Sequence, residues 1–516
     1  MHTTGLKGAM LSLQQDRLWT FQGDSEVYHA QCAVRLQGHL DVERLRHALQ
    51  WVVGLHEILH TVFYTPPGSD RPIQVINQSI EVPCPLINLE DKDTSIQDSL
   101  VASTFNALQF DLEHGPLVRA MVFRLSLQTH LLLLSLPALC ADAATLPLLI
   151  SELGAQYTGL QGIEALAEEP LQYVEVAAWQ DTLLESEGAK IPREFWRRVD
   201  LSQLARMPLP FVHRREERDR AAFRPETIDI AIEEALSIDI AKFAQRYTVS
   251  LDAILLAGWY ITLSRLTDEA HLIIGVAANG RPYEELADAL GCYTRFLPID
   301  ASFERWRTFE QLVNSVNQSL QEAMKWQSYF TWNLEHMPED GKSGMNYFPV
   351  SFEYESWPAN ISWGTLTLSL VRCVHCNEPF ALKLSALCVG ERLQLEVHYN
   401  AQYVSADSAR RLSSVLHTLL RSAVEQPAAP INVLRLLEAG SQKQLLNAFR
   451  APAQERPAQV LHYLFEKQAL RTPDQVAVMD TKEELTYHEL NRRANQLAAV
   501  LRRRGVGPNI LVGLCI

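Results

Sequence analysis

The stretch Leu131-Leu132-Leu133-Leu134-Ser135-Leu136-Pro137-Ala138-Leu139-Cys140-Ala141-Asp142-Ala143 carries the most information about the fold. Its first six residues are almost all apolar, which is typical of a strand that is buried on both faces. Residues 117–125 predict a neighbouring strand. A loop over 137–143 and a helix over 145–157 are predicted to follow, so the stretch predicts an α/β arrangement with a loop at one end of the strand.

Further strands and helices alternate on both sides of this stretch. Residues 30–36 alternate between apolar and polar, which predicts a half-exposed strand, and Asp41 then predicts a helix start. In the second half, an apolar helix over 251–266 precedes a strand over 272–276, and residues 393–399 alternate again. The elements therefore repeat in two similar halves of mixed α/β structure.

Composition limits the classes of function. The chain has 516 residues, 47% of them hydrophobic, and a formal charge of −15. This length predicts two to four domains. The acidic balance argues against nucleic-acid binding, which needs clustered Lys and Arg. We also expect no membrane span, because no apolar run approaches the ~20 residues required. With no signal sequence at the N-terminus, a cytoplasmic location is expected.

The eight cysteines show no disulfide-like spacing, which suits a reducing compartment. Cys373-Val374-His375-Cys376 contains one Cys-x-x-Cys pair, but a zinc site needs two more ligands and no second pair is nearby. We therefore interpret Cys373 and Cys376 as cysteines at the end of a strand, and we expect no metal site.

The loop at 137–143 resembles the signature of the condensation domain of nonribosomal peptide synthetases, His-His-x-x-x-Asp-Gly. Pro137 and Ala138 stand where the two His belong, Asp142 is kept, and Ala143 replaces Gly. Other stretches are similar to the family's motifs in the same order, namely Ser12-Leu13-Gln14-Gln15-Asp16-Arg17-Leu18-Trp19, His56-Glu57-Ile58-Leu59-His60-Thr61-Val62-Phe63, Phe110-Asp111-Leu112, Gly115-Pro116-Leu117 with Arg119, Asn279-Gly280-Arg281-Pro282, Leu290-Gly291, Phe296-Leu297-Pro298 and, faintly, Trp326-Gln327-Ser328-Tyr329.

The resemblance implies a fold of two lobes like chloramphenicol acetyltransferase, set in a V with a tunnel between them. We expect the first lobe over 1–188, the second over 189–432 and a linker over 433–457. Leu485-Thr486-Tyr487-His488-Glu489-Leu490 is similar to the first core motif of adenylation domains. We therefore expect 458–516 to be the truncated start of such a domain, ending in a buried strand over 512–516, in a fragment of a longer synthetase.

The resemblance also implies roles for individual residues. Asp142 is expected to pair with Arg281 and hold the loop in place, although it could instead, or in addition, cap the helix that follows. Ala138, Cys140, Ala143 and Gly291 are the candidates to line the tunnel. A cysteine needs a base or cationic neighbour to become a nucleophile, and the neighbours of Cys140 are apolar, so we expect a buried, inert thiol.

In the family, an amine on one carrier-bound group attacks the thioester on another. The resemblance therefore implies carrier-protein partners, phosphopantetheine arms as tethered substrates, the rest of the adenylation domain in the same synthetase, and no directly bound cofactor. Ala138 cannot orient an amine or accept its proton, so a slower domain is predicted. The loop only loosely matches the heterocyclisation motif, because Pro137 replaces its first Asp, and epimerisation domains keep the His.

Three functions are consistent with these residues. The first is a divergent condensation domain that still forms amide bonds. The second is a non-catalytic interface domain that docks a carrier protein or a tailoring enzyme. The third, a free-standing acyltransferase, is disfavoured by the adenylation motif. Because three of the four motif positions have changed together, the sequence slightly favours a non-catalytic or otherwise non-standard role.

Overall fold

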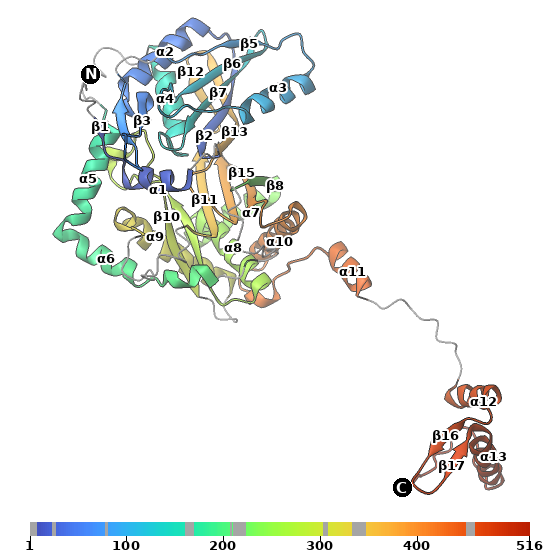
Figure 1. The fold of residues 1–516 in the computed structure, drawn as a ribbon. Helices are drawn as coiled ribbons and strands as arrows, with labels where there is room; N and C mark the ends of the chain where they lie inside the picture. Colours follow the sequence, from blue (N-terminus) through green and yellow to red (C-terminus); the bar gives the residue numbers. More distant parts are fainter. Residues whose placement is uncertain are drawn as a thin grey trace. The chain divides into compact units, whose positions relative to one another are not determined.

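A computed structural model describes residues 8–22, 27–77, 81–159, 170–206, 209, 223–302, 308–332, 347–449 and 460–515. The chain divides into two compact units, residues 1–438 and 439–516, and each is described by itself. The first unit contains two α/β lobes, each built on a six-stranded sheet (Figure 1). This confirms the expected fold class.

The first lobe contains the apolar strand of the decisive stretch at the centre of its sheet. The strand order is β12-β13-β2-β7-β6-β5. The strands are β2 His29–Gln37, β5 Leu86–Asn88, β6 Arg119–Ser126, β7 Thr129–Pro137, β12 Ile361–Trp363 and β13 Leu366–His375. Helices α2 (Val42–Leu55) and α4 (Thr145–Thr158) pack on one face and α3 (Thr94–Asn106) on the other, so β7 is buried on both faces as predicted.

Strands β12 and β13 correct the expected division of the lobes. Both fall within 189–432, the range expected for the second lobe, yet β13 pairs with β2 along most of its length. Sequence order therefore does not separate the lobes: the chain returns to the first sheet late and covers what would be an open edge of β2.

The second lobe has the strand order β10-β9-β11-β14-β15-β8. The strands are β8 Pro225–Ile230, β9 His271–Ala278, β10 Arg295–Ser302, β11 Val350–Trp357, β14 Leu382–Val389 and β15 Arg392–Asn400. Four helices cover one face, α7 Glu234–Tyr247, α8 Leu251–Thr267, α9 Phe309–Lys325 and α10 Ala406–Glu425. The central helix α8 is nearly all apolar because most of its side chains are buried.

Shorter elements complete the first unit. A small sheet has the order β1-β4-β3, with β1 Gly8–Ala9, β3 Thr61–Tyr64 and β4 Ile73–Ile76. The remaining α-helices are α1 Leu13–Gln22, α5 Tyr173–Glu185 and α6 Lys190–Arg197. The 3-10 helices among the described residues of this unit are η1 Glu57–His60, η2 Glu187–Ala189, η3 Leu201–Arg206, η4 Glu284–Leu286, η5 Gln327–Tyr329 and η6 Ile431–Val433.

No single helix in the described ranges is long and apolar enough to cross a membrane. Helices α7 and α8, bent by 109° at their junction, reach the required length and composition only as a pair. The apolar residues of α8 lie in the core of the second lobe.

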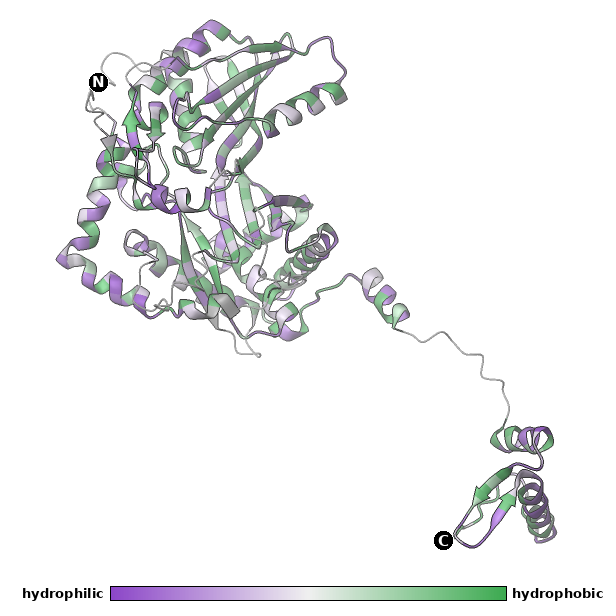
Figure 2. Cartoon of the chain, viewed as in Figure 1, coloured by the Kyte–Doolittle hydropathy of each residue, from purple (hydrophilic) through white to green (hydrophobic). Residues whose placement is uncertain are grey.

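The second unit contains α11 Ala439–Ala448, α12 Leu461–Arg471, β16 Val476–Met479, β17 Glu484–Thr486 and α13 Tyr487–Arg503. Two residues of the adenylation-like motif begin a helix: Thr486 and Glu489 form a reciprocal capping box at the start of α13. Strand β16 is hydrophobic, whereas much of α13 is hydrophilic (Figure 2). Residues 450–457 of the expected linker lie outside the described residues.

The expected strand over 512–516 is not present in the described part of this range. Residues 512–515 adopt no regular structure, and Leu514 is 85% exposed. The two-stranded sheet of this unit contains only β16 and β17, so no described neighbour pairs with the segment. An apolar run forms a stable strand only when a sheet satisfies its backbone groups, and the prediction of a buried strand was therefore wrong for 512–515.

Candidate functional site

The loop at 137–143 leaves the end of β7 and leads into α4. Pro137 is still part of β7 and lies opposite His29 of β2. The backbone N–H of Ala138 donates to the carbonyl of Tyr28 (3.0 Å), which prolongs this pairing by one bond. The N–H of Cys140 donates to the carbonyl of Pro137 (2.9 Å) and turns the chain. The loop is therefore ordered by its own backbone.

The four tunnel-lining candidates expose almost no surface. Ala138 and Cys140 are 0% exposed, Ala143 is 2% exposed and Gly291 is buried. A Cβ on Gly291 would lie 2.2 Å from the ring of Tyr173, so that ring already fills the adjacent space. In this structure all four positions are buried and offer no open surface to a substrate arm.

The chemistry at Cys140 follows from the same burial. No charged side chain offsets the loss of water, so burial raises the pKa of this thiol. The thiolate needed for a nucleophile is thereby disfavoured. The structure gives the motif loop no side chain able to act as nucleophile or base, since its other members are apolar or, in the case of Asp142, already paired.

Asp142 is the most heavily bonded residue of the loop and is fully buried. Arg281, which follows β9, donates to it from both terminal nitrogens, at 2.8 Å and 3.0 Å. The backbone N–H groups of Tyr293 and Thr294 each donate to Oδ2 at 3.0 Å. Arg281 follows β9 and Thr294 directly precedes β10, so Asp142 ties the first lobe to two strands of the second-lobe sheet.

Asp142 also bonds the start of α4. The N–H of Thr145 donates to Oδ1 at 2.9 Å and its hydroxyl donates at 2.7 Å. The structure thus shows the expected pair with Arg281 together with a bond to the first residue of α4, whose N-cap position is Ala144. Burial by itself raises the pKa of Asp142, but the positive charge and hydrogen bonds of Arg281, with those of Thr145, outweigh it and hold the pKa below its ordinary value. Asp142 is therefore a charged structural residue.

Family-like motifs distant in sequence support the same loop. The buried amide of Gln15 donates to the carbonyl of Leu139 (3.0 Å), so the motif near the N-terminus holds the loop directly. Ser12 shares a 2.7 Å hydrogen bond with the hydroxyl of Tyr173, which donates in turn to the carbonyl of Cys292 (2.8 Å). The sequence gives no signal for Tyr173, because this residue lies outside every motif that resembles the family.

Gln327 of the faint motif at 326–329 contacts the loop that follows β9 and the start of β10. The side-chain oxygen of Gln327 accepts from the N–H of Gly280 (3.0 Å), and its carbonyl accepts from Arg295 (3.0 Å). Gly280 has φ of +71°, and a Cβ there would lie 2.1 Å from the carbonyl oxygen of Tyr293. Glycine is therefore required at this position for both its backbone angle and its close approach. Gln327 thus fixes the loop that presents Arg281.

Cys373 lies near the end of β13 and Cys376 directly follows that strand. Burial raises the pKa of both thiols. No group of three or more His, Cys, Asp or Glu residues in the described ranges could hold a metal ion.

A polar face of the second-lobe sheet was not anticipated. Alternate residues of each strand point to opposite faces, and one face packs against the helices. The opposite face carries Ser351, Glu353 and Glu355 on β11, Lys383 and Ser385 on β14, Glu396 and His398 on β15, and Thr227 on β8. Many of these side chains are nevertheless buried; Glu353 and Lys383 are each 2% exposed.

Glu353 is the centre of a buried charge cluster that spans the lobes. It accepts from Lys383 at 2.8 Å and pairs with Nε2 of His375 at 3.0 Å. His375 belongs to β13 and therefore to the first-lobe sheet. Although burial opposes it, the charges of His375 and Lys383 hold the pKa of Glu353 well below its usual range, and Glu353 in turn raises the pKa of His375. Nothing in the strand pattern of β11 predicts which partners would meet Glu353.

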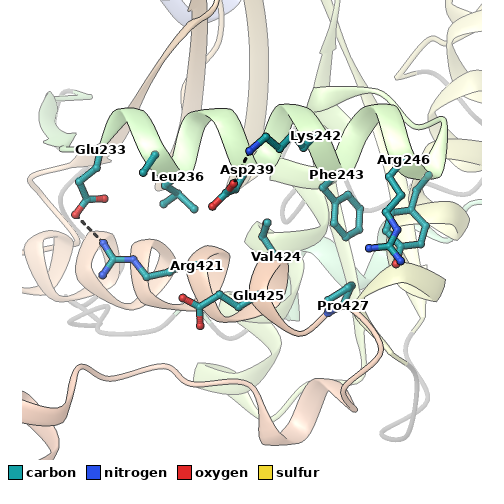
Figure 3. Close-up of a pocket in the computed structure, with 12 residues that line it drawn as sticks. Glu233, Leu236, Asp239, Lys242, Phe243, Arg246, Arg421, Val424, Glu425 and Pro427 are labelled. Atoms are coloured by element: carbon teal, nitrogen blue, oxygen red, sulfur yellow. Dashed lines mark hydrogen bonds and ion pairs between the residues drawn. The ribbon is translucent and has the colours of Figure 1, made fainter.

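A separate surface pocket of about 540 Å³ lies between α7 and α10 (Figure 3). Glu233 bonds His417 (2.9 Å) and Arg421 (2.6 Å) at its edge, and these partners lower its pKa to about 2. The pocket shares no residue with the loop or the polar face, and charges of both signs line it. It does not form part of the candidate site.

Comparison with known proteins agrees with this geometry. The family model described as Condensation domain matches residues 7–446, and that of AMP-binding enzyme matches 465–516. Tyrocidine synthase 3 from Brevibacillus parabrevis is 28% identical over 504 residues, which are 97% of this chain but 8% of that protein. The chain thus spans a small part of this curated relative.

Two solved structures show the same fold. SgcC5 from Streptomyces globisporus has a TM-score of 0.71 and 21% identity, covering 82% of this chain and 100% of its own. The complex of the X-domain and OxyB from teicoplanin biosynthesis gives a TM-score of 0.64 and 21% identity, covering 85% of this chain and 98% of the matched one.

Proposed function

Since the chain belongs to the condensation-domain family, we propose that it joins two phosphopantetheine-tethered substrates in a nonribosomal peptide synthetase without the motif histidine. The observation that carries this proposal is the intact support of the loop. Asp142 keeps its bonds to Arg281, Tyr293 and Thr294 although Pro137 and Ala138 replace the histidines. The site therefore retains the framework of a condensation domain and lacks one reactive side chain.

The loss of that side chain leaves a substantial catalytic contribution in place. Acid–base assistance typically contributes about 10²–10⁴ in rate. Holding two reactants together can contribute more, with effective molarities of about 10⁵–10⁸ M in favourable intramolecular cases. A neutral amine is already a competent nucleophile toward a thioester. We infer that positioning of two tethered substrates supplies most of the acceleration.

The proposed reaction is the aminolysis of a thioester. The nitrogen of the acceptor amine attacks the donor thioester carbonyl, a C–N bond forms and the C–S bond breaks. The nitrogen loses one proton, and the departing thiolate of the donor arm takes up one proton. The partners are accordingly two carrier-protein domains, with the rest of the adenylation domain in the same synthetase. A cytoplasmic location is part of the same proposal.

A non-catalytic interface domain is the second candidate. Two observations favour it: the loop offers no reactive side chain, and Ala138 and Cys140 are 0% exposed. The fold also resembles the X-domain that was solved with OxyB. In this case the domain would dock a tailoring enzyme or a carrier protein and form no bond.

One experiment separates the candidates. Donor and acceptor carrier domains are loaded with aminoacyl groups, mixed with the chain, and followed by intact-protein mass spectrometry. Transfer of the donor group to the acceptor, well above a control with carriers alone, would support amide formation and exclude the interface role. Absence of transfer across a panel of the twenty common aminoacyl groups, with carrier binding retained, would instead support the interface role.

A further inference from the structure

Glu355 is a carboxylate at the junction of the lobes with no assigned partner. It lies on the same polar face of β11 as Glu353, because the two are separated by two residues along the strand. Glu353 is fully engaged with Lys383 and His375. Among the described residues, by contrast, no hydrogen bond or ion pair reaches Glu355, whose side chain is half-buried. A half-buried, unpaired carboxylate is unusual for a purely structural residue.

The register of the sheet places Glu355 beside the loop framework. Strand β11 runs parallel to β9, with Ser351 opposite Gly275 and Phe352 opposite Val276. Continued at the same spacing, this register brings Glu355 level with Asn279, two residues before Arg281. Glu355 therefore lies near the end of β11 where the Asp142–Arg281 pair joins the lobes.

The charged and titratable groups around Glu355 come from four elements. They are Glu353 on its own strand, His375 and Cys373 on β13, Asp142 of the motif loop, and Arg281 after β9. Burial is the main influence; Glu353 and Asp142 act in the same direction, whereas His375 and Arg281 oppose them. Burial and the two carboxylates outweigh the two cations, so the pKa of Glu355 is raised from 4.5 to about 7. A carboxyl with this pKa can gain and lose a proton near neutral pH.

The neighbouring candidates are each unsuited to accept a proton. Asp142 already accepts several hydrogen bonds and has a lowered pKa. His375 is bonded to Glu353, and its raised pKa favours the cation, which has no free acceptor nitrogen. His398 lies on β15, two strands from β11 and thus about 10 Å away across the sheet. Cys140 is a buried neutral thiol. Glu355 remains as the group free to act.

We propose that the carboxylate of Glu355 accepts the proton of the attacking amine, in place of the histidine that the loop lacks. The inference rests on the proposed amide-forming function. The C–N bond forms as the nitrogen transfers its proton to a carboxylate oxygen of Glu355. The C–S bond then breaks, and Glu355 returns the proton to the leaving sulfur. The carboxylate is regenerated, and no further reactant is required.

The test compares Glu355→Gln with Glu396→Gln in the full chain. Glu396 is a matched control because it lies on the same face of the sheet but is paired with His398 at 3.1 Å. Single-turnover transfer is measured with an N-acetyl aminoacyl donor carrier and an aminoacyl acceptor carrier, over the panel of twenty side chains and from about pH 6 to about pH 8. Thermal unfolding of each variant is recorded in parallel.

We expect Glu355→Gln to lower the transfer rate about 10²-fold or more, within the range usual for acid–base assistance. It should also remove the rise in rate with pH near the pKa of Glu355. Glu396→Gln should keep the wild-type rate and pH profile, and Glu355→Asp should keep the pH dependence at a reduced rate. These results together would support the proposal.

Two results would overturn it, and they differ. Wild-type rate and pH profile in Glu355→Gln would exclude the role of Glu355 while leaving amide formation standing. No transfer by the wild-type chain, with every variant equal to the carriers alone, would remove the proposed function and with it the role of Glu355.

Discussion

Replacement of Asp142 by Asn should destabilise the first unit far more than an ordinary surface substitution. The substitution keeps the shape of the side chain and removes its charge. Arg281, whose side chain is 2% exposed, would then be a buried cation without its counter-charge. Whichever oxygen becomes an amide nitrogen would also face N–H donors, because Arg281 donates to both oxygens while Thr145 bonds Oδ1 and Tyr293 bonds Oδ2.

The magnitude follows from these contacts. Removing one partner of a buried ion pair typically costs about 3–5 kcal/mol, because the other charge stays buried. We therefore expect the free energy of unfolding of Asp142→Asn to fall by about this amount. Asp41→Asn is the matched control. Asp41 is an exposed N-cap that accepts from Arg44 (3.0 Å), and Asn caps helices as well as Asp, so its effect should be small.

The measurement is denaturant and thermal unfolding of wild type and both variants. The pH dependence gives a second test. The pKa of Asp142 is held below its ordinary value of 3.8, so its stabilising effect is fully present above that pH and is lost as the pH falls through the folded-state pKa. The difference between wild type and Asp142→Asn should therefore be constant near neutral pH and shrink in acid. Equal effects of Asp142→Asn and Asp41→Asn would show that the charge of Asp142 does not stabilise the buried Arg281.

Two further predictions concern the loop and the polar face. Ala138→His should lower the free energy of unfolding by about 1–3 kcal/mol and should not raise the transfer rate, because position 138 is 0% exposed and has no room for an imidazole. Ala144→His, at a half-exposed position, is the control. An Ala138→His variant that is as stable as wild type and transfers faster would contradict this prediction. Glu355→Gln should be more stable than wild type at pH 8, by up to about 3 kcal/mol. The raised pKa of Glu355 means that the wild-type protein loses stability as the pH rises from 4.5 to about 7, and Gln cannot ionise. Unfolding at several pH values checks this, and a difference between variant and wild type that does not shrink toward pH 4.5 would contradict it.

Local patterns in the sequence were sufficient for much of the fold. The apolar run that became β7, the N-cap at Asp41 and the long helix after Ser250 depend on nearest neighbours along the chain, and all three are present. The position of β13 in the first-lobe sheet was not predictable in this way. Its pairing with β2 joins residues far apart in sequence, and no local pattern specifies such a partner.

The residues of the candidate site were likewise predictable only in part. Resemblance to a family motif was enough to single out Asp142 and Arg281, and the structure brings them together. The burial of Cys140 was expected from its apolar neighbours, but nothing in the sequence indicated that Ala138 would also be fully buried, because exposure depends on tertiary packing. The cluster of Glu353, His375 and Lys383 was missed for a related reason: an alternating strand shows which residues share a face but not what covers that face.

The most direct test of the central claim is the single-turnover rate of amide formation by the unaltered chain, divided by the spontaneous rate between the same loaded carriers. We predict a ratio far above one, because positioning alone can supply a large effective molarity, and a rate that rises as Glu355 loses its proton near neutral pH. A ratio of one across the whole panel of substrates, from a folded chain that binds its carriers, would contradict it.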